Sequence, residues 1–233
     1  MTRRYILEIS VESVEAAFAA ERGGADRIEL CSNLREGGTT PGAELLRMAR
    51  ERVRLPIFVM IRPRGGDFFY SDGQFAAMRE SIDAAAELGA DGFVLGLLDA
   101  RGRVDVERTR ELVERAEPLP VTFHRAFDAC ADLRAALEDV IKTGAARVLT
   151  SGGKPTAPEA FEVLGELVRS AGERIVVMPG SGLNGENIHE AVERTGAREY
   201  HAGLSSVIAR GTYNIDGFEE EVRKLAAALS GAC

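Results

Sequence analysis

The chain lacks the long apolar segment that a membrane-spanning helix requires, because none of its apolar runs approaches about 18 residues. It contains three cysteines, Cys31, Cys130 and Cys233, which are far apart and form no C-x-x-C pair. This usage argues against a disulfide framework or a structural zinc site and favours a reducing cytoplasm. Basic residues are in the minority, 29 against 37 acidic ones, so the net charge is −8. That balance argues against nucleic acid or an anionic membrane as the main partner.

A short repeated phrase indicates the architecture. Gly-Ala begins this phrase at Gly24, Gly89, Gly144 and Gly196, where it closes a helical pattern and opens a short apolar run. Glycine suits the position after a helix, and the β-branched or aromatic residues that follow suit a strand. A second set of strands starts at Tyr5, Pro56, Pro120 and Ile175. Helical patterns separate the strands at about 13–22, 43–53, 72–88, 105–116, 132–143, 158–171, 185–195 and 216–229.

Strands that alternate with helices predict parallel βαβ units. Eight units in 233 residues fit a TIM (β/α)8 barrel, a fold that typically takes about 250 residues; an open doubly wound sheet is the alternative. No linker rich in proline, glycine or serine interrupts the pattern, so residues 1–233 are predicted to form one domain. It ends in a loop and helix at about 204–230, whose apolar face either closes the barrel or docks a second subunit in a homodimer.

Polar residues gather where the predicted strands end, which is where TIM barrels bind and react. They are Glu8, Glu29, Arg62, His124, Arg125, Asp128 and His201. Strand alternation, and the cost of burying a charge against apolar helices, predict that Glu8, Glu29, Arg62 and His124 point into the barrel mouth. A purely structural set of ion pairs is the alternative interpretation.

Glycine-rich loops follow the last three predicted strands. They contain Ser151, Gly152, Gly180, Ser181, Gly182 and Gly203. Backbone N–H groups in such loops often hold a phosphate in TIM barrels, so these residues are candidates for an anion site. Tight turns also use glycine, which is the alternative.

These residues support the hypothesis of an enzyme that acts on a small anionic or phosphorylated metabolite. Glu8 or Glu29 would be the general base, and His124 and His201 would carry protons. Arg62 and Arg125 would clamp an anion bidentately, with Asp128 beside them. Isomerisation, aldol cleavage and hydrolysis all fit. None of the strand ends carries a lysine, which disfavours a Schiff-base aldolase.

At these same residues the chain resembles the CutC family, the so-called copper homeostasis proteins. The resemblance runs from Glu8 to about Gly203 and rests on long phrases. They are Arg22–Cys31, Met60–Phe68, Thr122–Asp128, Thr150–Gly152 and Met178–Gly182, with Ser181 where the family often has glycine. The resemblance implies a TIM barrel, a cytoplasmic location and an association with copper(I).

Copper(I) prefers thiolate or thioether ligands, with imidazole as a borderline partner. The candidate ligands are Cys31, at the end of the second strand, and Cys130, after the fifth, with His124 or His201 nearby. The second and fifth strands are not neighbours in a barrel, and a buried apolar role for Cys31 is the alternative. The sequence therefore leaves two hypotheses open, a copper-binding protein and a barrel enzyme.

Overall fold

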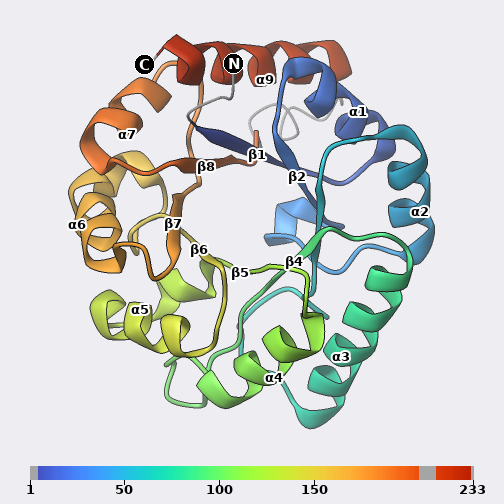
Figure 1. The fold of residues 1–233 in the computed structure, drawn as a ribbon, viewed down its shortest axis with the longest axis vertical. Coiled ribbons are helices and arrows are strands. Elements are labelled where there is room, and N and C mark those ends of the chain that lie inside the picture. The colour runs from blue at the N-terminus through green and yellow to red at the C-terminus, as the bar shows by residue number, and fades with distance from the viewer. Residues whose placement is uncertain (1–4, 205–213, 232–233) are drawn as a thin grey trace.

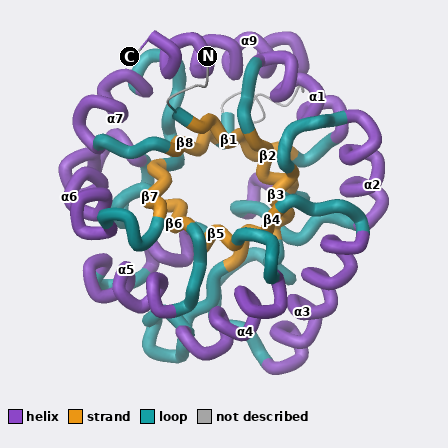
Figure 2. Tube along the Cα trace, in the orientation of Figure 1, coloured by secondary structure: helices purple, strands orange, loops and turns teal. Residues whose placement is uncertain are grey.

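The computed structural model describes residues 5–204 and 214–231, in which eight parallel strands form a barrel inside a ring of helices (Figure 1). The strands are β1 (Ile6–Val11), β2 (Arg27–Leu30), β3 (Ile57–Met60), β4 (Gly92–Leu95), β5 (Val121–Phe123), β6 (Arg147–Thr150), β7 (Val176–Pro179) and β8 (Glu199–Ala202). They pair in the order β7-β6-β5-β4-β3-β2-β1-β8, and a bridge between Gly180 and His201 brings β7 to β8. The predicted TIM barrel is confirmed (Figure 2).

The helices agree with the predicted patterns to within a few residues. They are α1 (Val14–Gly23), α2 (Ala43–Arg52), α3 (Asp72–Glu87), α4 (Val106–Ala116), α5 (Leu133–Lys142), α6 (Phe161–Ala171), α7 (Ile188–Thr195) and α9 (Ile215–Gly231). The largest differences are at α6 and α7, which both begin three residues later than the patterns predict; a 3-10 helix, Ala157–Ala160, precedes α6. Asn184 and Asn187 delay α7, because their side chains accept hydrogen bonds from nearby backbone N–H groups and form a turn instead of helix.

The repeated phrase connects each helix to the strand beside it. Gly24 adopts the left-handed conformation, with a φ of 95°, and ends α1. Two residues later Asp26 accepts a hydrogen bond from the backbone N–H of Leu7 on β1. Asp91, in the second copy, does the same for Ile57 on β3. The phrase therefore stops a helix and sets the next strand beside its neighbour.

Helix α9 completes the outer ring between α7 and α1 (Figure 1). Its apolar residues Phe218, Val222 and Leu225 are buried. At Gly23 of α1 a Cβ atom would lie 2.6 Å from the Cβ of Val222, so glycine permits the close approach of the two helices. The apolar face of this helix was predicted either to close the barrel or to dock a second subunit. The structure shows the first role, because α9 packs between α7 and α1. The homodimer stays a prediction, and residues 205–213 of the predicted loop lie outside the described residues.

The barrel interior contains charged side chains rather than a purely aliphatic core. The guanidinium groups of Arg27 and Arg147 lie 4.8 Å and 5.0 Å from the ring centre of Phe58. Arg27 forms ion pairs with Glu8 and Glu199, and Arg147 lies 3.2 Å from the Glu199 carboxylate. This group, Glu8, Arg27, Phe58, Arg147 and Glu199, is called the interior ion network below. It forms the layer beneath the barrel mouth.

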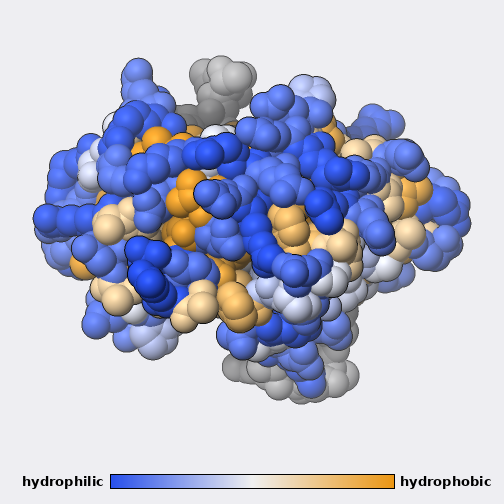
Figure 3. All heavy atoms as spheres, turned by 90° about the horizontal axis from the view of Figure 1, so that it is seen from below, coloured by the Kyte–Doolittle hydropathy of each residue, from blue (hydrophilic) through white to orange (hydrophobic). Residues whose placement is uncertain are grey.

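Most of the outer surface in Figure 3 is hydrophilic, and its apolar residues lie in small groups. Within the described ranges, the large apolar side chains with marked exposure are Phe18, Met48, Phe69 and Val163. The helices that the structure describes include none long and apolar enough to cross a membrane.

Candidate functional site

A cavity of about 680 Å³ opens at the carboxyl ends of the strands. Its lining includes six of the predicted site residues that carry ionisable groups: Glu29, Arg62, His124, Arg125, Asp128 and His201. Ser181, Gly182 and Gly203 also line it, together with apolar Met60 and Phe68. The volume suits a small organic molecule and is much larger than a bare metal ion requires.

Two glutamates and a histidine meet on one side of the barrel, at the base of this cavity. Strand register explains the meeting, because Glu8 on β1 pairs directly with His201 on β8, and Glu29 on β2 pairs with Ser10 one step further along β1. The Nε2 atom of His201 lies 3.2 Å from Glu29 Oε2 and 3.9 Å from Glu8 Oε1. Sequence separation between them is large, so the barrel topology alone brings these groups together.

All three side chains are buried: 0%, 3% and 7% of Glu8, Glu29 and His201 is exposed. Each still has a polar atom without a hydrogen-bond partner among the described residues, namely Glu8 Oε1, Glu29 Oε1 and His201 Nδ1. Burial by itself lowers the pKa of His201, but the carboxylates of Glu29 and Glu8 raise it more, so the net shift is upward. The cluster thus places an imidazole beside two carboxyl groups that favour its protonated form.

The same cluster could hold a metal ion. One ligand atom from each of Glu8, Glu29 and His201 lies within 4.8 Å of the others. Two carboxylates and one imidazole make a donor set that suits a divalent cation such as Mn²⁺ or Zn²⁺. Copper(I) prefers softer sulfur ligands, so this group by itself fits that ion poorly.

Glu8 differs from the other two because the interior ion network holds it. Its Oε2 atom accepts from Arg27 Nε, and Arg27 also donates to Glu199 at 2.6 Å. Burial lowers the pKa of Arg27, but Glu8 and Glu199 raise it more, so the guanidinium stays charged. Glu8 is not part of the cavity lining, and Glu29 is. Of the two predicted bases, Glu29 is therefore the one that a ligand can reach.

His124 is placed at the cavity wall, as predicted, but its state differs from the expected proton carrier. Its Nδ1 atom accepts a hydrogen bond from the backbone N–H of Ala126. Burial, and then the positive charge of Arg62, lower the pKa of His124 to about 3. The low pKa favours a neutral imidazole near pH 7, which suits a hydrogen-bonding group better than the expected proton carrier.

Arg62 braces the loops around the mouth. Its Nη1 atom donates to the carbonyls of Glu36 and Gly38, and its Nη2 atom donates to the carbonyl of Gly66. The Phe68 ring lies 4.9 Å from the guanidinium carbon. These three bonds use three of the five N–H donors of Arg62, and its buried Nε atom has no partner among the described residues. The bidentate clamp of an anion by Arg62 stays a prediction.

Asp128 occupies the predicted anion site in the loop after β6. Its carboxylate accepts from the backbone N–H groups of Ser151 and Gly153 and from Arg125 Nε at 2.8 Å. The N–H of Gly152 donates to Thr150 Oγ1 instead. Since an internal carboxylate satisfies these donors, Ser151 and Gly152 do not form the free anion cradle that was expected. Arg125 likewise donates hydrogen bonds to Asp128, to the Ser151 hydroxyl and to two loop carbonyls.

The glycines after β7 and β8 allow neighbouring side chains to come close to the backbone where these two strands meet. A Cβ atom at Gly180 would lie 2.5 Å from Leu149 Cδ1 and 3.1 Å from the Cβ of His201. Ser181 and Gly182 follow with φ values of 75° and 73°, in the left-handed region that favours glycine. The Ser181 hydroxyl donates to the carbonyl of Pro155 at 2.9 Å. An anion site at Gly180, Ser181, Gly182 and Gly203 stays a prediction.

Comparison with known proteins shows which family this barrel belongs to. The model of the CutC family matches residues 5–206. The chain belongs to the CutC family. It is 49% identical over 202 residues to the human protein named copper homeostasis protein cutC homolog, covering 87% of this chain and 74% of that one. It is 48% identical over 203 residues to a family protein CutC of Xylella fastidiosa, with 87% and 76% covered.

The structure of the putative copper homeostasis protein CutC from Streptococcus agalactiae is also similar. Its TM-score is 0.79 at 32% identity, and the match covers 85% of this chain and 98% of that one. A phosphoribosylanthranilate isomerase from Pyrococcus furiosus matches with a TM-score of 0.63 at 16% identity, over 96% and 99% of the two chains. This second likeness shows the barrel fold alone.

The two cysteines predicted to bind copper in this CutC protein lie in different surroundings. Cys31 belongs to a small cluster with Phe58 and Met60, and its Sγ atom lies 3.6 Å from Glu29 Oε2. Cys130 belongs to the main hydrophobic core, and its Sγ atom contacts the carbonyl of Ala126 at 3.9 Å. Because the two cysteines belong to separate clusters of buried side chains, the structure does not favour them as one pair of thiolate ligands. Burial, and then the Glu29 charge, raise the pKa of the Cys31 thiol.

Sequence reasoning missed the interior ion network of this CutC chain. Arg27 precedes Glu29 by two residues, and Glu199 precedes His201 by two. Strand alternation therefore places each pair on the same side of its strand, and the argument that was applied to Glu29 and His201 applies to them equally. Arg147 on β6 could have been found in the same way.

Proposed function

We propose that this CutC-family protein binds a small organic anion in the barrel mouth and transfers a proton to or from it with the Glu29–His201 pair. The observation that carries the proposal is a buried carboxylate–imidazole pair, 3.2 Å apart, on the wall of a cavity of about 680 Å³. A protein that only binds a metal ion does not need a cavity of this size. It also does not need a polar wall that extends to His124 on the opposite strands.

The chemistry follows from the groups that the cavity exposes. One carboxylate oxygen of Glu29, Oε1, has no hydrogen-bond partner among the described residues, and the other, Oε2, is hydrogen-bonded to His201. A carboxylate in this position can take a proton from a C–H bond beside a carbonyl group, and the adjacent imidazole can stabilise the carboxylate through that hydrogen bond. The interior ion network holds Glu8 behind the pair.

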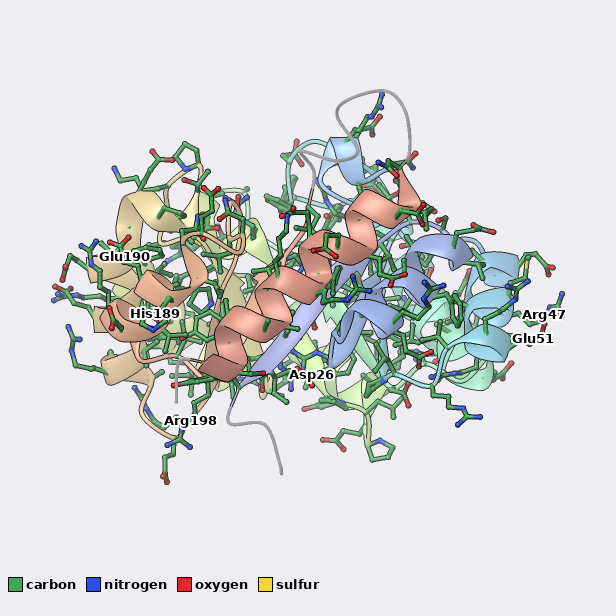
Figure 4. The ribbon with its side chains drawn as sticks, turned by 90° about the horizontal axis from the view of Figure 1, so that it is seen from above. Asp26, Arg47, Glu51, His189, Glu190 and Arg198 are labelled. Atoms are coloured by element: carbon green, nitrogen blue, oxygen red, sulfur yellow. The ribbon has the colours of Figure 1, made fainter. Side chains whose placement is uncertain are left out.

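The first test is hydrogen exchange, because proton-transfer enzymes exchange substrate C–H hydrogen with solvent. A set of small keto acids and sugar phosphates is incubated with the protein in D2O and followed by proton NMR. We expect at least one compound to lose a C–H signal, and Glu29→Gln to slow that loss by about 100-fold or more. Glu51→Gln is the matched control, since Glu51 is exposed on α2 (Figure 4). The proposal is abandoned if the wild-type protein exchanges none of them or if E29Q exchanges as fast.

A second candidate function is metal binding, and the closeness of Glu8, Glu29 and His201 favours it. The names of the relatives suggest copper as the metal. Cys31 would supply the soft ligand that copper(I) requires, since its sulfur lies beside Glu29. Cys130 would supply none. A cytoplasmic location belongs to the same proposal, because Cys31 and Cys130 are both free thiols.

Anaerobic titration with copper(I) against a competing chelator tests this candidate. Cys31→Ser is expected to weaken copper(I) binding at least about tenfold, because a hydroxyl is a poor ligand for a soft ion. Cys130→Ser is the matched control and is expected to bind like the wild type. Equal affinity in all three proteins would remove Cys31 as a ligand, and parallel titration with Zn²⁺ shows whether the carboxylates prefer a harder ion.

A further inference from the structure

Three contacts hold the ring of His124 in one orientation. Its Nδ1 atom accepts a hydrogen bond of 3.2 Å from the backbone N–H of Ala126. The ring of Phe68 lies against it, with 5.1 Å between the ring centres. On the other side, a Cβ atom at Gly96 would lie 2.5 Å from Nδ1, so only glycine leaves room for the imidazole there. The ring is therefore positioned before any ligand arrives.

The hydrogen bond to Ala126 also determines where the imidazole proton sits. A ring nitrogen that accepts a hydrogen bond carries no proton, so in the neutral ring the proton is on Nε2. His124 lines the cavity, and its buried Nε2 atom has no partner among the described residues. His124 thus presents an N–H donor that has no partner in the part of the chain that the structure describes.

The surroundings keep this donor neutral. Arg62 is the charged group that acts on His124, and the low pKa of about 3 follows from burial and from that charge. The remaining contacts, with Phe68, Gly96 and the Ala126 backbone, carry no charge. A neutral imidazole beside an arginine can donate to an anionic oxygen but does not give up its proton, because the imidazolate that would remain is very basic.

We propose that His124 binds an anionic oxygen of the ligand through Nε2–H, and that the ligand is therefore a small keto acid or a closely related carbonyl compound. This inference rests on the proposed proton-transfer function. When Glu29 takes a proton from the C–H bond beside the carbonyl, the electron pair of that bond moves toward the carbonyl oxygen. The oxygen becomes an enolate oxygen and accepts the Nε2–H hydrogen bond. No bond within His124 breaks, and protonation of the carbon reverses the step.

Nitrogen-15 NMR of the wild-type protein tests the donor directly. The chain has three histidines, so labelling with nitrogen-15 histidine gives a simple spectrum. We expect His124 to show the neutral tautomer with the proton on Nε2, both at pH 7 and at pH 5. Oxalate, a planar dianion that resembles an enolate of a keto acid, is the probe, and it should shift the Nε2–H signal of His124. The signal of His189, which lies on the outer helix α7 (Figure 4), should not move.

A proton on Nδ1, or a spectrum that oxalate leaves unchanged, overturns the inference. Two substitutions add a second measurement. His124→Ala removes the donor and is expected to slow deuterium exchange about 100-fold, the usual cost of losing one oxyanion donor. His124→Gln keeps an N–H group at a similar reach and should lose less than the alanine variant.

The two proposals fail in different ways. If the wild type and H124A exchange deuterium equally well, the role of His124 is excluded and the proton-transfer function stands. If the wild type exchanges nothing while oxalate still shifts the Nε2–H signal, the anion-binding role of His124 stands and proton transfer is excluded. Because the NMR measurement uses the unmodified protein, a variant that does not fold leaves the result intact.

Discussion

Replacing Arg27 with methionine is expected to lower the free energy of unfolding by about 3–5 kcal/mol. Arg27 lies inside the barrel, paired with Glu8 and Glu199, and only 6% of it is exposed. Methionine has a similar length and can still pack on the Phe58 ring, but it leaves the buried carboxylate of Glu8 without its arginine and Glu199 with Arg147 alone. The cost arises from those uncompensated charges rather than from lost packing. Urea denaturation at pH 7 measures it.

Arg47 provides the matched control, because it also bonds two glutamates but does so on the outside of α2 (Figure 4). Water and salt screen exposed pairs, so Arg47→Met should leave stability nearly unchanged. The double variant R27M/E8Q should recover part of the loss, since it removes the carboxylate that has lost its arginine. If R27M is no less stable than R47M, the interior ion network contributes nothing to the stability of the barrel.

Acidification is expected to destabilise the wild-type protein by about 3 kcal/mol more than the His124→Gln variant between pH 7 and pH 4.5. In the folded chain the pKa of His124 is lowered to about 3, while the ordinary value is 6.5. The unfolded chain therefore takes up a proton on this histidine as the pH falls below 6.5, and the folded chain does not until about pH 3. The unfolded state gains stability throughout that window, so the folded protein loses it.

The comparison with H124Q isolates one group from the many that titrate in acid. Glutamine can occupy the same space and has no proton to gain in this range. His189→Gln is the second control, because that imidazole is exposed on α7, and this variant should follow the wild type. Stability is measured by urea denaturation at several pH values. Parallel losses in the wild type and H124Q would mean that His124 is protonated in the folded chain above pH 4.5.

The elements of the barrel were predictable because their signals are local. Period-two and helical spacing, the Gly-Ala phrase and the prolines before β3 and β5 each act within a few residues. The starts of α6 and α7 were the exceptions, and at α7 the side chains of Asn184 and Asn187 compete with the helix for backbone donors. That competition is also local, but composition and periodicity do not reveal it.

The candidate site was predicted as a group of residues but not as a set of contacts. Strand-end position alone placed Glu29, His124 and His201 around one cavity, as the structure has them. The hydrogen bonds that Arg62 and Asp128 form could not be predicted in this way. Their partners lie in loops whose meeting depends on the folded chain, such as the carbonyl of Gly38 for Arg62 and the Gly153 N–H for Asp128.

The sequence by itself determined the barrel, the family and which side chains reach its mouth, because parallel strands that share one direction must end at one rim. Only the tertiary structure decided which of those side chains remain available to a ligand. A carboxylate or guanidinium is free or engaged according to the loops that surround it, and an imidazole is charged or neutral according to its burial and neighbours. Among the described residues, Glu29, His201 and His124 keep polar atoms without partners, while the polar groups of Asp128 and Arg125 are engaged within the fold and those of Arg62 are engaged except Nε.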